Sequence, residues 1–133
     1  MKLSDFVSDG YAFTLEQDIY EFAVEPLTEG LSKINFGTNS SSSTHSALSF
    51  VGASAKKIVS NPFLLSIAGV TLANAVGKWQ KQAKSDIFFS AMTSTEKKFY
   101  EKMVKDLVGT GKYHILKASQ LPGSGYEWIL RKK

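Results

Sequence analysis

The 133-residue chain contains no cysteine, a single arginine and only two histidines. The absence of cysteine excludes disulfides, thiolate metal ligands and cysteine nucleophiles, although it does not fix the cellular compartment. Lysine supplies the rest of the 16 basic residues, and its ammonium group cannot bind a phosphate through two parallel hydrogen bonds as the arginine guanidinium does. The formal net charge of +4 is too small to indicate nucleic-acid binding unless the charges are concentrated in one patch.

The sequence also lacks a catalytic or metal-binding pattern. His45 lies in a serine tract and His114 beside Tyr113, and neither has the further ligands at the spacing that a zinc site requires. No Gly-x-Ser-x-Gly elbow, calcium loop or phosphate-binding glycine loop is present. We therefore expect a protein that is not an enzyme, with no catalytic residue, no metal, no cofactor and no small-molecule substrate.

Long apolar runs are scarce. The most apolar stretch, Phe63 to Gly77, is shorter than the roughly 20 residues that a membrane-spanning helix needs, and Ser66, Thr71 and Asn74 interrupt it. A helix from Pro62 to about Ala83 in a soluble bundle therefore fits this stretch better than a membrane helix. Lysines flank both ends of the stretch, as they often do in membrane helices, so membrane insertion remains an alternative.

Small residues repeat every fourth position in this helix. Gly69, Ala73 and Gly77 would stack on one face and leave a shallow groove. A second helix can approach such a groove closely, with backbone contacts replacing side-chain contacts. We interpret this face as a helix-packing interface and the helix as the element around which the chain is organised.

Residues 1–36 predict a short N-terminal helical segment. Thr14 begins a capping-box pattern. Apolar residues then follow at helical spacing: Leu15, Ile19, Phe22 and Ala23. The alternation of Tyr20, Phe22 and Val24 would instead produce a strand, and we favour the helix.

Residues 37–46 predict a serine-rich linker, and residues 47–92 a central apolar helical region. Ala47 to Ser60 has the pattern of a weak amphipathic helix, which the Asn-Pro pair that follows would separate from the central helix. Ser85 to Met92 is apolar and can continue the helical region.

Residues 93–133 predict a helix followed by a β-hairpin. Thr93 begins a second capping-box pattern, and the apolar residues of Thr95 to Val108 recur at helical spacing. Lys112 to Ala118 and Tyr126 to Arg131 alternate as strands do, on either side of a Pro-Gly turn. An isolated hairpin is only marginally stable, so it should pack on the helix and form a small α+β cap.

These elements together predict a mainly α fold, with short helices around the central small-residue-rich helix and the α+β cap at the C-terminal end. Large aromatic residues and the single arginine are the candidates for contacts with a partner. They are Trp79, Tyr113, Tyr126, Trp128 and Arg131.

The best-fitting function is a structural or assembly subunit of a larger complex, such as a minor component of a virus or phage particle, whose partners are other proteins or copies of itself. One alternative is a small membrane-inserting protein that uses the central helix. The other is a basic nucleic-acid-binding accessory protein that uses the lysines of the C-terminal third. The N-terminal sequence has no apolar stretch after its first lysine, so a signal peptide is not expected.

Overall fold

The computed structural model of the protein describes residues 6–8, 10–15, 18–38, 53–81, 84–123 and 125–133. The elements in these ranges are, in chain order, β1 (Phe6–Ser8), β2 (Ala12–Leu15), β3 (Asp18–Thr28), β4 (Leu31–Thr38), α1 (Ala53–Ser60), α2 (Pro62–Gln80), β5 (Asp86–Ala91), α3 (Ser94–Gly109), β6 (Tyr113–Gln120) and β7 (Tyr126–Lys132). Four strands therefore precede the first helix, and the remaining strands are divided by α3.

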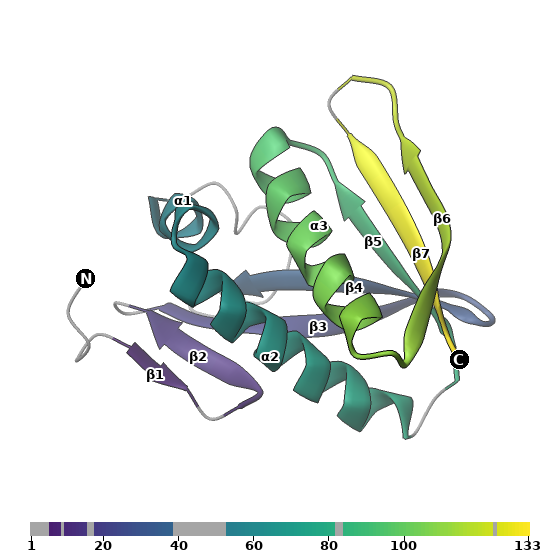
Figure 1. Ribbon diagram of the computed structural model, residues 1–133, viewed down its shortest axis with the longest axis horizontal. Helices are drawn as coiled ribbons and strands as arrows, with labels where there is room; N and C mark the ends of the chain where they lie inside the picture. The colour runs from purple at the N-terminus through teal and green to yellow at the C-terminus, as the bar shows by residue number, and fades with distance from the viewer. Residues whose placement is uncertain (1–5, 9, 16–17, 39–52, 82–83, 124) are drawn as a thin grey trace.

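The strands form one mixed sheet in the order β1-β2-β3-β4-β5-β7-β6 (Figure 1). A tight turn joins β3 to β4, and Gly30 occupies its left-handed position with φ of 81°. Strands β4 and β5 are parallel, whereas the other neighbouring strands are antiparallel. Parallel neighbours require a crossover connection, and α1 and α2 lie in the connection between β4 and β5.

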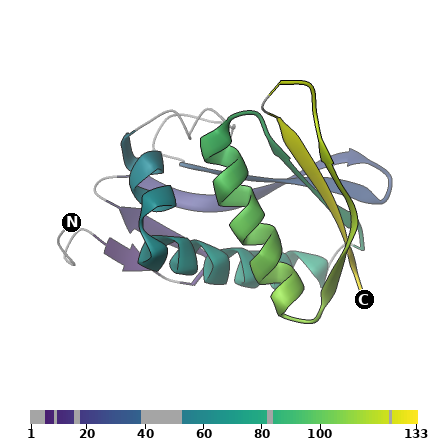
Figure 2. The same ribbon diagram turned by 45° about the horizontal axis from the view of Figure 1, so that its top comes forward.

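The three helices lie on the same face of the sheet, which gives the molecule two layers (Figures 1 and 2). Burial along β5 alternates accordingly, because Ile87, Phe89 and Ala91 are fully buried while Phe88 and Ser90 are only partly buried. This alternation is typical of an antiparallel or mixed sheet with one face packed on the core. The hydrophobic core therefore lies between the sheet and the helices.

Aromatic side chains of α3 join it to the centre of the sheet. The Phe99 ring centroid lies 4.6 Å from that of Phe36 on β4, and the Tyr100 centroid 5.8 Å from that of Phe89 on β5. The Tyr100 hydroxyl accepts a hydrogen bond of 3.0 Å from the backbone N–H of Phe36. Burial raises the pKa of Tyr100 above its ordinary value, so this hydroxyl stays protonated and holds α3 on β4.

Several elements predicted from the sequence are confirmed. The central helix begins at Pro62, and the Asn61 side chain caps it by accepting hydrogen bonds from two backbone N–H groups at 2.9 and 3.3 Å. Thr93 caps α3 by accepting from the N–H of Glu96 at 3.2 Å. The C-terminal hairpin is formed by β6 and β7, with Gly123 at positive φ in its turn. Helix α1 confirms the second half of the helix expected over 47–60.

The N-terminal helix predicted from Thr14 onwards is wrong, because this part of the chain forms β2 and β3. Phe22 and Val24 pair with Phe36 and Ile34 of β4. The two-residue alternation, which competed with the helical spacing in the sequence, prevails because β4 supplies a partner strand. Strand preference depends largely on such cross-strand and core packing, which a single segment does not reveal.

The extension of the central helical region through Ser85 to Met92 is also wrong. Asp86–Ala91 forms β5, which pairs with both β4 and β7. A short apolar run cannot be assigned to a helix or a strand by periodicity alone. Its central position in the sheet explains why it is so apolar.

The mainly α fold class and the description of the chain as helical are therefore corrected to a sheet-rich α+β fold. Strand β4 extends through Thr38, past the expected start of the serine-rich linker at residue 37. The rest of that linker, which includes His45, and the first part of the helix expected from residue 47 lie outside the described residues.

Candidate binding surfaces

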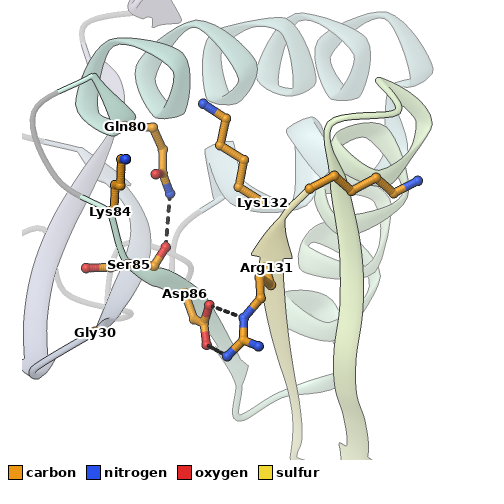
Figure 3. A pocket seen from close by; sticks show the side chains of 8 residues that line it. Gly30, Gln80, Lys84, Ser85, Asp86, Arg131 and Lys132 are labelled. Carbon is orange, nitrogen blue, oxygen red and sulfur yellow. Dashed lines mark hydrogen bonds and ion pairs between the residues drawn. The ribbon is translucent and has the colours of Figure 1, made fainter.

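One end of the molecule brings together the end of α2, the start of β5, the end of β7 and the β3–β4 turn around a cavity of about 580 Å³ (Figure 3). The Gln80 side-chain amide ties α2 to β5 by donating to the carbonyl oxygen of Ser85 at 3.1 Å. Lys84 and Lys132 lie on either side of Gln80 (Figure 3). Segments that are distant in the sequence therefore supply neighbouring positive charges.

A second cavity of about 520 Å³ adjoins the first and shares Lys132 with it. Tyr11 forms part of its wall, and the ammonium group of Lys78 lies 5.1 Å from the centroid of the Tyr11 ring. The Asn74 side chain donates a hydrogen bond of 2.7 Å to the carbonyl oxygen of Gly10. These contacts fix Gly10 and Tyr11 against α2 and so define one side of the second cavity.

Positive charge is concentrated around the two cavities. Seven cationic side chains line them, and we call this set the basic end: Lys78, Lys81, Lys84, Lys112, Arg131, Lys132 and Lys133. Asp86 is the single carboxylate among the described lining residues, which leaves an excess of six positive side-chain charges.

Only one cation of the basic end is engaged by that carboxylate. The Arg131 guanidinium donates two hydrogen bonds of 3.0 Å to Asp86, and these bonds raise the pKa of Arg131. None of the six lysines forms an ion pair with a carboxylate in the described part of the chain. No carboxylate of the described residues therefore competes with an external anion for these ammonium groups, and that of Lys78 also lies over the Tyr11 ring.

The edge strand β6 is a second exposed feature. It pairs with β7 alone among the described strands, so the hydrogen-bonding groups along its outer side face away from the sheet (Figure 1). Ile115 and Leu116 are 47% and 44% exposed although both are large and apolar. The pairing register shifts between Ile115 and Lys117, which makes Leu116 the extra residue of a β-bulge.

The predicted small-residue face of α2 is divided between two environments. Gly69 is buried against α3, where a Cβ atom would overlap Oδ2 of Asp106 and lie 3.1 Å from its Cγ. Ala73 is partly buried, whereas Gly77 is exposed and a Cβ there would meet nothing within 4 Å. A helix of the same chain therefore already occupies the Gly69 end. No helix in the described ranges is both long enough and apolar enough to cross a membrane.

The candidate aromatic contact residues lie mostly in the core. Trp128 and Tyr113 are only 4% and 5% exposed, and burial raises the pKa of Tyr113. Trp79 is partly buried against the core. Tyr126 packs on Trp128 with a centroid distance of 4.8 Å and has the ammonium group of Lys97 4.9 Å from its ring. Of the five candidates, Arg131 belongs to the basic end, and the buried Tyr113 also lines the second cavity.

The described residues contain no group of three His, Cys, Asp or Glu side chains that could hold a metal ion. His114 is partly buried on β6, opposite Arg131 of β7. Glu96 is buried, and its Oε1 accepts from the backbone N–H of Met92 at 3.2 Å, while Oε2 has no hydrogen-bond partner among the described residues. Together with the Thr93 cap, this contact gives Glu96 a structural role at the start of α3.

The sequence analysis recognised only part of the basic end, and it did not recognise β6 as an edge strand. It took the lysines at the end of α2 only as charges that flank the apolar stretch, and it treated the C-terminal lysines separately. The sequence signal that could have joined them is the clustering of Lys78, Lys81 and Lys84, but the pairing of β5 with β7 was needed to bring Arg131 beside Asp86. Ile115 was assigned to a strand with no sign that this strand lies at an edge.

Comparisons with known proteins leave the function open. No protein-family model matches the chain, and no curated protein or solved structure is significantly similar to it. The expectation of a virus or phage particle component therefore has only the sequence behind it.

Proposed function

We propose that this is a non-enzymatic assembly protein whose copies join through the edge strand β6. The observation that carries the proposal is the exposure of Ile115 and Leu116 on an eight-residue edge strand whose outer side has no partner among the described strands. A strand with free backbone donors and acceptors can add a strand from another chain, and neighbouring apolar side chains add buried area.

The two edges of the sheet differ in a way that supports this assignment. Strand β1, at the other edge, has three residues within the described part of the chain, and a very short edge strand offers little for another chain to pair with. Strand β6 is longer, and its central lysine, Lys117, is paired with Glu127 on the neighbouring strand β7. Part of the charge that would discourage pairing at this edge is thereby neutralised.

Closed association through one strand is most simply two-fold, because the same surface then meets itself. In an antiparallel pair of β6 strands, the sheet would continue from one copy into the next. The bulge at Leu116 interrupts the regular ladder and would confine the pairing to part of the strand. We therefore expect weak, concentration-dependent dimers.

Sedimentation velocity between about 1 and 200 µM tests the proposal. The wild-type protein should shift from monomer towards dimer with rising concentration, and the double variant Ile115→Lys/Leu116→Lys should remain monomeric. The matched control is Val70→Lys/Met92→Lys, which places the same charge on two exposed apolar residues of α2 and the β5–α3 loop.

The control should associate as the wild-type protein does. A wild-type protein that stays monomeric over the whole range contradicts the proposal. Equal dissociation of both double variants also contradicts it, because the effect would then come from net charge. Circular dichroism establishes that both variants are folded before their association is compared.

A further inference from the structure

The basic end requires an explanation that strand pairing does not provide. Its seven cations come from the end of α2, the α2–β5 connection, the α3–β6 connection and the end of β7, yet they surround two adjoining cavities with a single carboxylate among the described lining residues. We propose that the basic end binds the phosphate backbone of a nucleic acid. This activity is independent of the assembly function proposed for β6.

Stabilisation of helix ends accounts for only part of this charge. Lysines near a helix C-terminus interact favourably with the partial negative charge there, which explains Lys78 in the last turn of α2 and Lys81 at its cap. Lys132 lies at the end of a strand, where no such dipole exists, and Lys84 lies in the connection to β5. The convergence of these lysines from separate segments therefore points to an external anion.

The extent of the basic end favours a polymer over a small phosphate compound. A lone phosphate group is satisfied by a few donors, whereas the lysines here are spread around two cavities of about 580 and 520 Å³ that share Lys132. A nucleic-acid backbone presents phosphates at regular intervals and can contact cations around both cavities. The concave shape allows the backbone to approach lysines on more than one side.

The same surface fits an anionic membrane less well. Membrane-surface binding combines basic side chains with apolar residues that enter the lipid. Among the described residues lining the two cavities, Tyr11 is the one large apolar side chain with substantial exposure, at 50%. The exposed aliphatic residues of the molecule, such as Ile115 and Val70, line neither cavity.

Lysine chemistry determines the kind of recognition. Six of the seven cations are lysines, which act as point charges and do not provide the paired donors with which arginine reads guanine. The single arginine is already bound to Asp86. Binding should therefore be independent of base sequence and strongly dependent on salt.

Fluorescence anisotropy with labelled 20-nucleotide single-stranded and duplex DNA tests the inference. With about five phosphate contacts, affinity for the duplex should fall about 500-fold between 50 and 200 mM salt. The triple variant Lys84→Gln/Lys132→Gln/Lys133→Gln should bind at least about tenfold more weakly at 50 mM salt, with a salt slope smaller by about three.

The control is Lys57→Gln/Lys98→Gln/Lys105→Gln, which removes three exposed charges that line neither cavity. It should retain most of the affinity and the wild-type slope. Absence of binding at 50 mM salt, salt-independent binding, or equal losses in both triple variants overturns the inference. Binding to vesicles containing phosphatidylserine without binding to DNA also overturns it. Displacement of DNA by 5 mM inorganic phosphate at constant ionic strength overturns it as well, because the ligand would then be a small anion.

Discussion

Alanine at Gly69 and alanine at Gly77 should have opposite effects on stability, although both residues lie inside α2. Alanine is favoured over glycine in a helix interior by about 0.5–1 kcal/mol, mainly because glycine loses more backbone freedom on folding. At Gly77 the added Cβ meets nothing within 4 Å, so the variant should gain most of this stabilisation. Gly77→Ala therefore measures the difference in helix propensity between alanine and glycine, with little contribution from new contacts.

At Gly69 the same methyl group would overlap the carboxylate of Asp106 on α3. To make room, the carboxylate would have to rotate away, which disturbs its ion pair with Lys102 (Nζ to Oδ1 2.6 Å), or the two helices would have to move apart. An exposed ion pair of this kind contributes about 0.3–0.5 kcal/mol, and an overpacked contact costs about 1–3 kcal/mol. Because the propensity gain is common to both variants, it cancels in the comparison, and Gly69→Ala should be less stable than Gly77→Ala by about 2 kcal/mol.

Urea unfolding followed by circular dichroism gives both free energies of unfolding. The decisive comparison repeats Gly69→Ala in an Asp106→Ala background. In the Asp106→Ala background the added methyl group no longer overlaps a carboxylate, so Gly69→Ala should become as favourable as Gly77→Ala. The coupling energy between positions 69 and 106 should be about 1–3 kcal/mol. The reasoning fails if Gly69→Ala stabilises the protein while Asp106 is present, or if removing Asp106 leaves its effect unchanged.

Three further predictions concern α3. Tyr100→Phe should lower the free energy of unfolding at neutral pH by about 1–3 kcal/mol, because the N–H of Phe36 loses its acceptor. In the wild-type protein the free energy of unfolding should fall by about 1.4 kcal/mol per pH unit above pH 10, since the raised pKa keeps the buried hydroxyl protonated while the unfolded chain ionises. In Tyr100→Phe this fall in the free energy of unfolding with rising pH should be absent, as measured by urea titrations between pH 8 and 11. A variant with the same pH dependence as the wild-type protein contradicts the prediction. Thr93→Ala should cost about 1 kcal/mol through loss of the α3 cap, whereas Ser94→Ala, at the neighbouring exposed position, should stay within about 0.5 kcal/mol; equal thermal shifts would refute the capping role.

The parts of the fold that the sequence predicted are those determined by local chemistry. The Asn61 and Thr93 caps begin their helices through hydrogen bonds within three residues, and Gly123 allows the hairpin turn. Strand β3 was not predictable in the same way, because Phe22 is compatible with either period until Phe36 of β4 lies opposite it. The seven-stranded sheet depends on such pairings, so the sequence predicted only β6 and β7 among its strands.

The surfaces were harder to predict because they depend on tertiary neighbours rather than on spacing. The small-residue spacing drew attention to Gly69, but the contact made there is with Asp106, an acidic side chain of the same chain. Lys84 and Lys132 are almost fifty positions apart and meet only because β5 and β7 are adjacent. From the sequence, the C-terminal lysines therefore suggested nucleic-acid binding only as an alternative function, and the lysines at the end of α2 looked like ordinary helix-end lysines.

Strand β7 connects the two proposed surfaces and indicates how they would be arranged in a dimer. It pairs with the edge strand β6 along its length, and its last residues enter the basic end. Lys112, just before β6, belongs to the basic end, whereas Gln120 at the other end of the strand does not. In an antiparallel β6 pair, the Lys112 positions of the two copies would therefore lie at opposite ends of the shared strands, up to about 27 Å apart for eight residues. Strand pairing would leave both basic ends open and place them where one nucleic-acid molecule could contact both.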